Sequence, residues 1–410
     1  MSRQWQRAAL FGILTALAHR LALTVWMAIA WSIMSGYLPD ARADFHATED
    51  ARLPALTSPV EQSLLGVWRR WDAVHYLDLA TNGYRLDQAG STVFGALTPL
   101  MLRVVSVVTG GSADLASLVV QTAAFAAALA LLYQFCALVF GDEDLGKAAV
   151  LTTALFPLSF YFAAPLSESI YLLLALALML WSFQGRWLAA SIAGFLAALA
   201  RSQGVVLAII PGLLILEQHG IDWRRPSTWV PAALRSLRHG WVLAFIPLGA
   251  LAFVAYRTSL GLPSLGDTYA QYSYHFFVNP LEGLWINLRW IAAHPADLFA
   301  SLDVFMMVLS FVGLGIALRF PKHRRLALIA FTLGHLLVFV SKINWVWGTT
   351  DQVLYSQSFA RYTVILFPLL ILLADGARRL PKLLRIAAGI VSGLLLLLAS
   401  ALFTVALIGP

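Results

Sequence analysis

Long apolar runs, separated by short polar segments, make up most of the chain. A helix needs about 17–25 mostly apolar residues to cross the hydrocarbon core of a bilayer. The pattern therefore predicts an all-α polytopic membrane protein with about eleven transmembrane helices, in a single domain over residues 1–410. The expected spans, three of them short, are 8–36, 113–140, 147–163, 165–184, 188–201, 204–217, 240–260, 298–319, 325–341, 361–377 and 386–408.

Composition agrees with this class and excludes others. Of 410 residues, 60% are hydrophobic and 12% are charged, whereas soluble domains have about 25% charged residues. The net charge of +7 does not indicate a nucleic-acid partner, because cytoplasmic loops of membrane proteins carry an excess of Arg and Lys. The one cysteine, Cys136, excludes an intramolecular disulfide and a cysteine-based metal site. The first apolar run exceeds the roughly 7–15 residues of a signal-peptide core, so we expect a retained span.

Basic residues set the expected orientation. Four basic clusters should all be cytoplasmic, which requires an even number of crossings between the N-terminus and the 218–239 loop. The apolar segment 93–108 would make that number odd, so we expect an interfacial or re-entrant helix there, broken at Thr98-Pro99, with Arg103 at the headgroups. The clusters lie at 3–7, 224–238, 319–325 and 378–385.

The remaining long loops are then external, at 37–112, 261–297 and 342–360. The first contains a polar, aromatic-rich segment, Glu61 to Tyr84, directly after the first span and before a possible juxtamembrane helix. An ionisable cluster beside a membrane that is not a cytoplasmic anchor indicates chemistry or transport.

Four charged residues in four different loops come out on this external face: Asp72, Glu168, Arg201 and Arg361. The two arginines run against the positive-inside trend and so need another use. One use is an ion-pair network that holds helix ends together. The other is recognition of an anionic substrate.

Four motifs connect these residues to a known family. Over about residues 60–375 the chain resembles the PIG-V mannosyltransferases, within the GT-C group of polyprenyl-phosphate-sugar-dependent glycosyltransferases. The usual family run FFPLYP is present here only as VFGALTP (93–99). The motifs are WDAVHYLDLATNGY (71–84), FPLSFYFAAPLSES (156–169), LAALARSQGVV (196–206) and FARYTVILFPL (359–369).

The resemblance implies a GT-C-type bundle with external juxtamembrane helices. It also implies inverting transfer of mannose, as in GPI mannosyltransferases, from a polyprenyl- or dolichyl-phosphate-mannose donor to a hydroxyl of a lipid-linked or glycan acceptor. Such a reaction needs a carboxylate that takes the acceptor's proton, fixed positive charge for the departing phosphate, and orientation of both substrates.

Asp72 is the expected base. On a helix, His75 and Tyr76 follow at i+3 and i+4 and would face the same side, where they could hold sugar. Asp78 points about 120° away, which makes it a weaker candidate for substrate binding. Alternatively, Asp72 caps a helix or pairs with Arg69 or Arg70.

Arg201 and Arg361 are the expected phosphate ligands, since guanidinium groups match phosphate oxygens and remain charged. Glu168 could position the acceptor, hold one of these arginines, or cap a helix. Trp71 and Tyr362, in the same motifs, complete the expected substrate-binding set. The aromatic-rich loops 266–280 and 343–351 suit either an interface belt or sugar stacking.

Other polar residues are expected to be structural. His19, Arg20 and His335 lie deep in spans and should be interior hydrogen-bond partners. Their spacing does not indicate a metal, and no cofactor is expected. The expected location is a bacterial plasma membrane with an external site, or the endoplasmic reticulum membrane with a luminal site in a eukaryote.

Two other functions are compatible with a polar cavity. A flippase or transporter of lipid-linked oligosaccharides would use it as a translocation path, although no inverted repeat or pair of broken helices is evident. A noncatalytic subunit is disfavoured because the acidic, basic and aromatic motifs occur together.

Overall fold

The computed structural model describes residues 3–34, 51–272, 274–346, 349 and 352–405. Parts of three predicted external loops, residues 37–50, 273, 347–348 and 350–351, therefore lie outside the described residues. The α-helices are α1 (Arg3–Met34), α3 (Pro59–Leu64), α4 (Asp72–Asn82), α5 (Leu97–Ser106), α6 (Ala113–Phe135), α7 (Glu143–Leu155), α8 (Glu168–Phe183), α9 (Trp187–Ala200), α10 (Ile209–Gln218), α11 (Trp229–Gly240), α12 (Phe245–Ser259), α13 (Leu265–Tyr272), α14 (Pro280–Ala293), α15 (Leu298–Arg319), α16 (Leu326–Ser341), α17 (Phe359–Tyr362), α18 (Phe367–Arg378) and α19 (Lys382–Thr404).

Short helical turns join several of these helices. They are η2 (Gly66–Trp68), η3 (Leu86–Val93), η4 (Cys136–Phe140), η5 (Ser159–Phe162), η6 (Ser202–Ala208), η7 (Pro226–Thr228), η8 (Trp241–Ala244) and η9 (Thr363–Ile365). The all-helical prediction is confirmed, with one small exception. Strands β1 (His275–Phe277) and β2 (Lys342–Asn344) pair antiparallel, with His275 opposite Asn344 and Phe277 opposite Lys342.

Five helical segments are long and apolar enough to cross a membrane, and two sharply bent helix pairs could raise the number to seven. The predicted number of about eleven is not confirmed. Shorter apolar helices account for much of the difference: α8 has 16 residues, about 24 Å at 1.5 Å per residue, which is less than the roughly 30 Å of a hydrocarbon core. The five are 3–34, 113–140, 226–259, 298–319 and 382–404.

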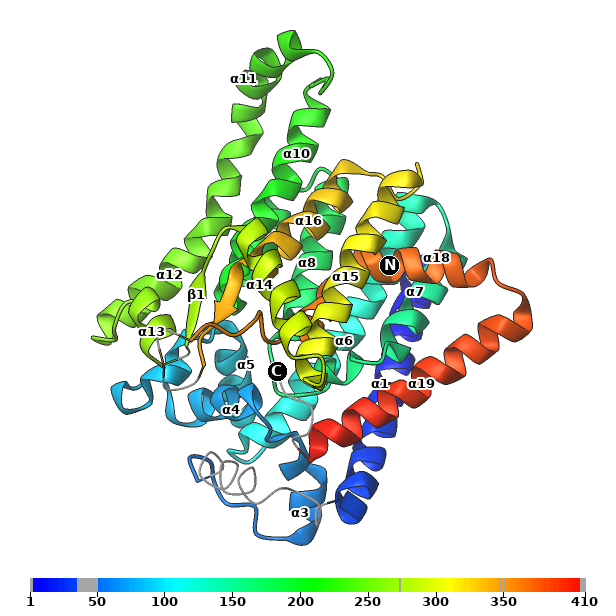
Figure 1. Ribbon diagram of the computed structural model, residues 1–410. Coiled ribbons are helices and arrows are strands. Elements are labelled where there is room, and N and C mark those ends of the chain that lie inside the picture. Colours follow the sequence, from blue (N-terminus) through cyan, green and yellow to red (C-terminus); the bar gives the residue numbers. More distant parts are fainter. Residues whose placement is uncertain (1–2, 35–50, 273, 347–348, 350–351, 406–410) are drawn as a thin grey trace.

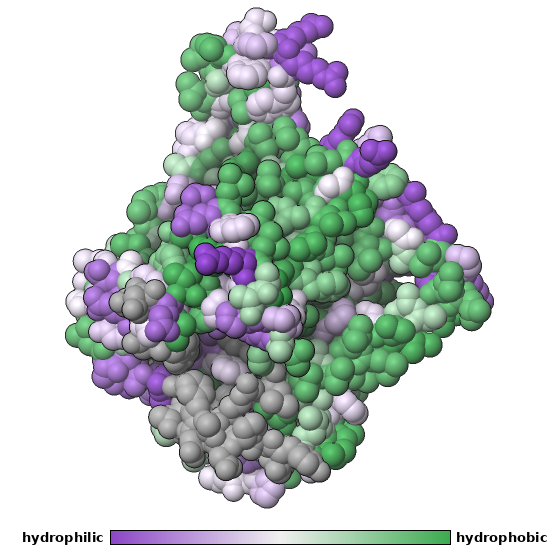
Figure 2. Space-filling model, viewed as in Figure 1, coloured by the Kyte–Doolittle hydropathy of each residue, from purple (hydrophilic) through white to green (hydrophobic). Residues whose placement is uncertain are grey.

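Small residues allow the central helices to approach closely. α1 packs along α6, and a Cβ on Gly12 would lie 2.8 Å from the backbone nitrogen of Ala130, so only glycine fits there. The opposite face of α1 exposes apolar side chains such as Leu10 and Leu21. Much of the surface in this view is likewise hydrophobic (Figure 2), as expected for contact with lipid tails.

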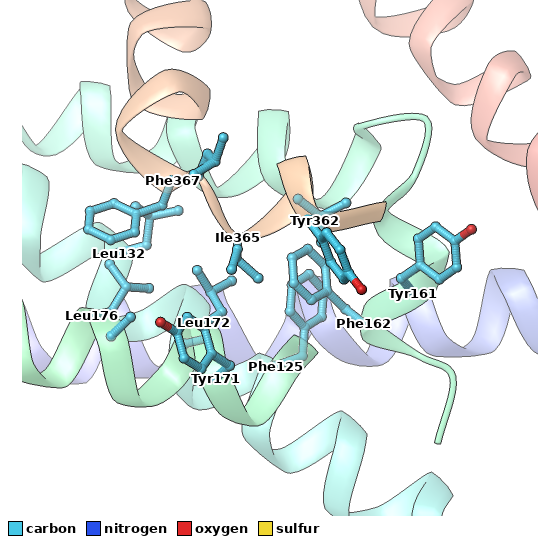
Figure 3. Packing of buried hydrophobic residues seen from close by; sticks show 14 of the residues in the cluster. Phe125, Leu132, Tyr161, Phe162, Tyr171, Leu172, Leu176, Tyr362, Ile365 and Phe367 are labelled. Atoms are coloured by element: carbon cyan, nitrogen blue, oxygen red, sulfur yellow. The ribbon is translucent and has the colours of Figure 1, made fainter. Parts of the chain in front are cut away.

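Aromatic rings pack together in the interior of the bundle. Phe125 of α6 stacks on Phe162 with ring centres 4.7 Å apart, and the side chains of Tyr171, Ile365 and Tyr362 surround them (Figure 3). This packing fixes α6, α8 and the α17–α18 segment against one another. Two charged residues of the site, Glu168 of α8 and Arg361 of α17, belong to these elements.

The segment 93–108 does bend, but not at the predicted place. η3 and α5 meet at 111°, with the break between Val93 and Leu97. Thr98 and Pro99 instead lie in the first turn of α5, where the missing proline N–H is tolerated. Arg103 donates to the carbonyls of Ala80 and Thr81 and so ties α5 to the end of α4.

Gly95 lies at this break, inside the run that departs from FFPLYP. A Cβ on Gly95 would collide with the carbonyl of Ala200, the residue before Arg201. Short helices α3, α4, α5 and α13 gather with β1 at one end of the bundle (Figure 1). The long spans therefore support a layer of short elements, and the predicted site residues lie in and beside that layer.

Candidate functional site

Asp72 is the first residue of α4, and an unusual backbone turn precedes it. Trp71 adopts φ +53°, a left-handed value that an L-residue rarely takes, and its side chain does not cap the helix. Such a conformation costs about 1–3 kcal/mol. The turn directs Asp72 toward Arg361, whose Nη1 lies 2.5 Å from Asp72 Oδ2.

The structure gives Asp72 a partner that neither alternative named, Arg361. Asp72 does not occupy the N-cap position, which belongs to Trp71. Arg69 is paired instead with Asp114, at 2.7 Å. Arg70 donates to the main-chain carbonyls of Gly66 and Thr404.

Glu168 joins the two predicted arginines. It begins α8, is fully buried, and accepts from Arg361 Nε at 2.6 Å and from Arg201 Nη1 at 2.7 Å on the same oxygen, Oε1. It is not among the described residues that line the cavity, and both of its ion pairs are with these guanidinium groups. The four charged residues predicted on one face thus form one chain of contacts: Asp72, Arg361, Glu168, Arg201.

A cavity of about 460 Å³ opens beside this chain. Six of the nine predicted site residues line it: Asp72, His75, Tyr76, Arg201, Arg361 and Tyr362. His75 Nδ1 lies 2.8 Å from the Ser91 hydroxyl, and the Tyr76 hydroxyl donates to Ser167. Asp72 keeps a quarter of its side chain exposed, whereas Arg361 is 3% exposed. The carboxylate is therefore the more accessible partner of the pair.

The other three predicted residues are not among the described residues that line the cavity. Glu168 lies directly behind the arginines. Trp71 is partly buried against the main hydrophobic core. Asp78 points to the other side of α4, where it accepts from Asn82 at 2.7 Å and from Arg85 at 3.3 Å, which favours a structural role for it.

Lys342 is the most important residue that the sequence predictions missed. It begins β2, lines the cavity, and donates to the Tyr362 hydroxyl at 2.9 Å. Tyr362 also lies 5.0 Å from the Arg201 guanidinium, ring centre to Cζ. Lys342 follows an apolar span on the external side, so the charge argument that selected the two arginines would have selected it as well.

The charge of this region is positive. The cavity is lined by three cations, Arg201, Arg361 and Lys342, and by the carboxylate of Asp72; a second carboxylate, Glu168, lies behind the arginines. Both carboxylates are paired with arginine, and within the described chain Lys342 has no carboxylate partner. An anionic group of a ligand would therefore be drawn to the lysine end of the cavity.

The strand pair that carries Lys342 also contributes amide, imidazole and aromatic side chains to the cavity. Asn344 Nδ2 donates to Gln357 at 2.9 Å and lies 3.4 Å from His275 across the strands. The rings of Tyr272 and Phe277 line the cavity as well. The two predicted aromatic loops therefore supply a wall of the cavity, which an interface belt alone would not do.

Burial by itself would raise the pKa of Asp72, but the nearby cations outweigh it. Arg361, with His75 and Lys342, holds the pKa of this carboxyl below its ordinary value of 3.8. Asp72 is therefore ionised at neutral pH. It is also a weak base while Arg361 remains in contact, because a good general base has a pKa near the working pH.

The deeper polar residues are interior partners, as predicted. His19 Nε2 lies 3.0 Å from the Ser159 hydroxyl, Arg20 donates to Thr122, and His335 lies 2.7 Å from the Tyr171 hydroxyl. Within the described residues, no group of three or more His, Cys, Asp or Glu side chains could hold a metal ion.

Comparison with known proteins agrees with the resemblance drawn from the motifs. Residues 18–216 match the family described as Mannosyltransferase (PIG-V). This region includes Asp72, Glu168 and Arg201, whereas Arg361 and Lys342 lie beyond it. None of the curated proteins matches the chain significantly.

Solved structures similar to the chain include oligosaccharyltransferases of Archaeoglobus fulgidus. One, complexed with Zn and sulfate, is 12% identical with a TM-score of 0.39, covering 84% of this chain and 49% of that one. Another, AglB with an inhibitory peptide and a dolichol-phosphate, is 12% identical with a TM-score of 0.40, covering 84% and 52%. The chain thus spans about half the length of these proteins.

Proposed function

We propose that this chain, a membrane glycosyltransferase of the PIG-V mannosyltransferase kind, moves mannose from a polyprenyl- or dolichyl-phosphate-mannose donor to a hydroxyl of a lipid-linked or glycan acceptor. One observation carries the proposal: an ionised carboxylate, Asp72, faces the same cavity as Arg201, Arg361 and Lys342. An attacking hydroxyl and a departing phosphate need these two kinds of group side by side.

The cations would receive the donor phosphate. When the bond between the anomeric carbon and the phosphate oxygen breaks, its electron pair stays on that oxygen, so the phosphate gains negative charge. Lys342 and the outward-facing nitrogens of the two arginines stabilise this charge at fixed positions. Glu168 contributes by holding both guanidinium groups in place before the donor arrives.

Asp72 would act as the base. The acceptor oxygen attacks the anomeric carbon from the side opposite the phosphate, its proton passes to Asp72, and the configuration at that carbon inverts. A phosphate that engages Arg361 competes with Asp72 for the same guanidinium. Donor binding would thereby weaken the ion pair, and the buried carboxylate would become a stronger base.

The amide and imidazole side chains beside the strand pair suit the acceptor. Asn344, Gln357 and His275 provide donors and acceptors of hydrogen bonds, which match sugar or polyol hydroxyls. The aromatic rings beside them can cover the apolar face of a sugar ring. On the predicted orientation, the cavity opens to the outside of a bacterial plasma membrane or to the lumen of the endoplasmic reticulum.

The test uses purified protein in detergent with radiolabelled polyprenyl-phosphate-mannose and a total membrane lipid extract. We expect label to move to a lipid or glycan product, and Asp72→Asn protein purified in parallel to form little of it. The rival flippase function predicts no new covalent product, because detergent removes the two compartments between which it would act. Label that stays on the donor would contradict the proposal.

A further inference from the structure

Arg361 lies on a helix that is too short to be stable by itself. α17 contains only four residues, Phe359–Tyr362. An isolated helical turn is unstable because its nucleation is unfavourable. Ser358, which precedes it, has φ +72°, and its side chain does not cap the turn. Something outside the segment must therefore fix the backbone that directs Arg361 into the site.

Asp303 of α15 makes that contact. Its Oδ1 accepts the backbone N–H of Ala360 at 2.6 Å, and its Oδ2 accepts that of Ser358 at 3.0 Å. Both oxygens thus satisfy amides at the start of α17, a task that an N-cap side chain usually performs from within the same segment. Asp303 is 7% exposed and is not among the described residues lining the cavity.

A second contact, and the position of Asp303 in α15, also indicate that residues 356–360 are held from outside. Asn287 of α14 accepts the backbone N–H of Ser356 at 3.0 Å, so two anchors from different helices hold residues 356–360. α15 is one of the helices apolar enough to cross a membrane. A carboxylate within such a helix is expensive and is usually kept for function.

We propose that Asp303 is a positioning residue: it fixes α17 so that Arg361 meets the donor phosphate and Asp72 together. This inference rests on the proposed function, which assigns the phosphate to Arg361. Asp303 touches neither substrate. Its effect should fall more on the donor than on the acceptor, because the backbone that it holds carries Arg361 and Tyr362. On the acceptor side, His275 and Asn344 lie on the strands, and only Gln357 lies on the held segment.

The experiment measures the donor KM, the dependence on lipid extract, and hydrogen exchange of residues 356–363 in purified full-length Asp303→Asn. An amide offers one acceptor where the carboxylate offers two, so one backbone N–H loses its partner. A hydrogen bond to a charged group corresponds to a factor of about 10–100 in an equilibrium constant. We expect the donor KM to rise about 10-fold or more and hydrogen exchange at 358–361 to accelerate. The amount of lipid extract needed for half of the maximal rate should change less than about 2-fold.

Asp375→Asn is the matched control. Asp375 is similarly buried, at 6% exposure, and pairs with Lys322, His323 and Arg379 near the other end of α18. We expect this variant to lose stability without a change in donor KM. If general destabilisation explained the Asp303 result, both variants would weaken donor use equally, and the inference would be wrong.

Asp303→Glu decides the case if Asp303→Asn does not fold. Glutamate keeps both carboxyl oxygens but is longer by one carbon–carbon bond, about 1.5 Å, which displaces α17. A raised donor KM supports the inference and an unchanged one overturns it. Hydrogen exchange separates this inference from the proposed function. If wild-type protein transfers no mannose, the proposed function fails, while unchanged exchange at 358–361 in the folded Asp303 variant would overturn the positioning role by itself.

Discussion

Asp72 and Arg361, separated by 289 positions in the chain, meet at 2.5 Å, and this contact both ionises the carboxylate and occupies it. In the structure without substrate, the proposed base is thus held by the proposed phosphate ligand. Removal of Arg361 leaves Asp72 without its arginine partner, whereas removal of Asp72 leaves Arg361 paired with Glu168. The predictions on the base, the arginines and pH depend on this coupling.

The first prediction concerns the base. Asp72→Asn keeps the size of the side chain but cannot accept a proton, so turnover should fall by about 10²–10⁴, the usual contribution of a positioned acid or base. Donor KM should remain within a few-fold. Asp78→Asn is the control, because Asp78 lies on the other side of α4. Strong loss in Asp78→Asn alone would move the catalytic role to Asp78.

The second prediction concerns the arginines. Arg361→Ala should lose more activity than Arg201→Ala, because Arg361 contacts both carboxylates and Arg201 contacts only Glu168. Lysine should restore either position only in part, since an ammonium cannot bridge two oxygens as the planar guanidinium does. Steady-state kinetics with varied donor will measure this, after thermal stability in detergent has excluded misfolding. Equal, full rescue by lysine would contradict the geometry.

The third prediction separates the lysine of the strand pair from the amide and imidazole side chains beside it. Lys342→Ala removes the cation that has no carboxylate partner in the described chain, and should raise the donor KM by about 10-fold or more. Asn344→Ala removes a neutral hydrogen-bonding group at the other end of the same strand. It should instead raise the amount of lipid extract needed for half of the maximal rate. A donor effect in both variants would mean that these groups do not divide the substrates as proposed.

The fourth prediction concerns pH. Because Arg361 lowers the pKa of Asp72, the carboxylate's contribution to activity and stability is present above the ordinary pKa of 3.8 and is lost only as pH falls through the lowered value. In Arg361→Gln the attraction is absent and burial dominates, so the acid limb of kcat/KM should move to higher pH. Arg378→Gln, which removes an arginine paired with Asp142 and on the predicted cytoplasmic side, should leave that limb in place.

The fifth prediction concerns topology. With Cys136 replaced, a cysteine at Asp87 should react with an impermeant maleimide from outside, whereas one at Ser227 should not. Asp87 is exposed, and it is a better choice in this segment than Ser91, which is buried; Thr350, another position on the predicted external side, lies outside the described residues. Labelling of Ser227 from outside would reverse the predicted orientation of the four basic clusters.

The sequence predicted most of the charged centre because one physical rule applied to it. Arginines on the side that normally lacks them, together with acids in neighbouring loops, marked residues that the fold does bring together. The strand pair was not predicted because three-residue strands such as 275–277 are too short to show a period of two. Lys342 was not selected, although the same charge rule applied to it. Asp303 escaped because its partners are backbone amides 55 and 57 positions away, which leave no pattern in the sequence.

The number of spans was harder to predict for a related reason. Hydropathy identifies apolar runs, but not whether a run of about 16 residues crosses the membrane or stops inside the protein. Helices such as α8, with 16 residues, are surrounded by other helices, so their apolar character reflects burial in protein as much as contact with lipid. Tertiary packing, rather than composition, sets their role.

The site is divided between two lengths of chain. Asp72, Glu168 and Arg201 fall within the region that matches the mannosyltransferase family, whereas Arg361, Lys342 and the strand pair lie outside it. The acid that would activate a hydroxyl is therefore encoded separately from several groups that would select what is bound. Substitutions at the amide and aromatic positions of the strand pair, with Arg361 and Lys342 kept for the departing phosphate, could exchange one acceptor for another, which gives protein engineers a defined region in which to alter specificity.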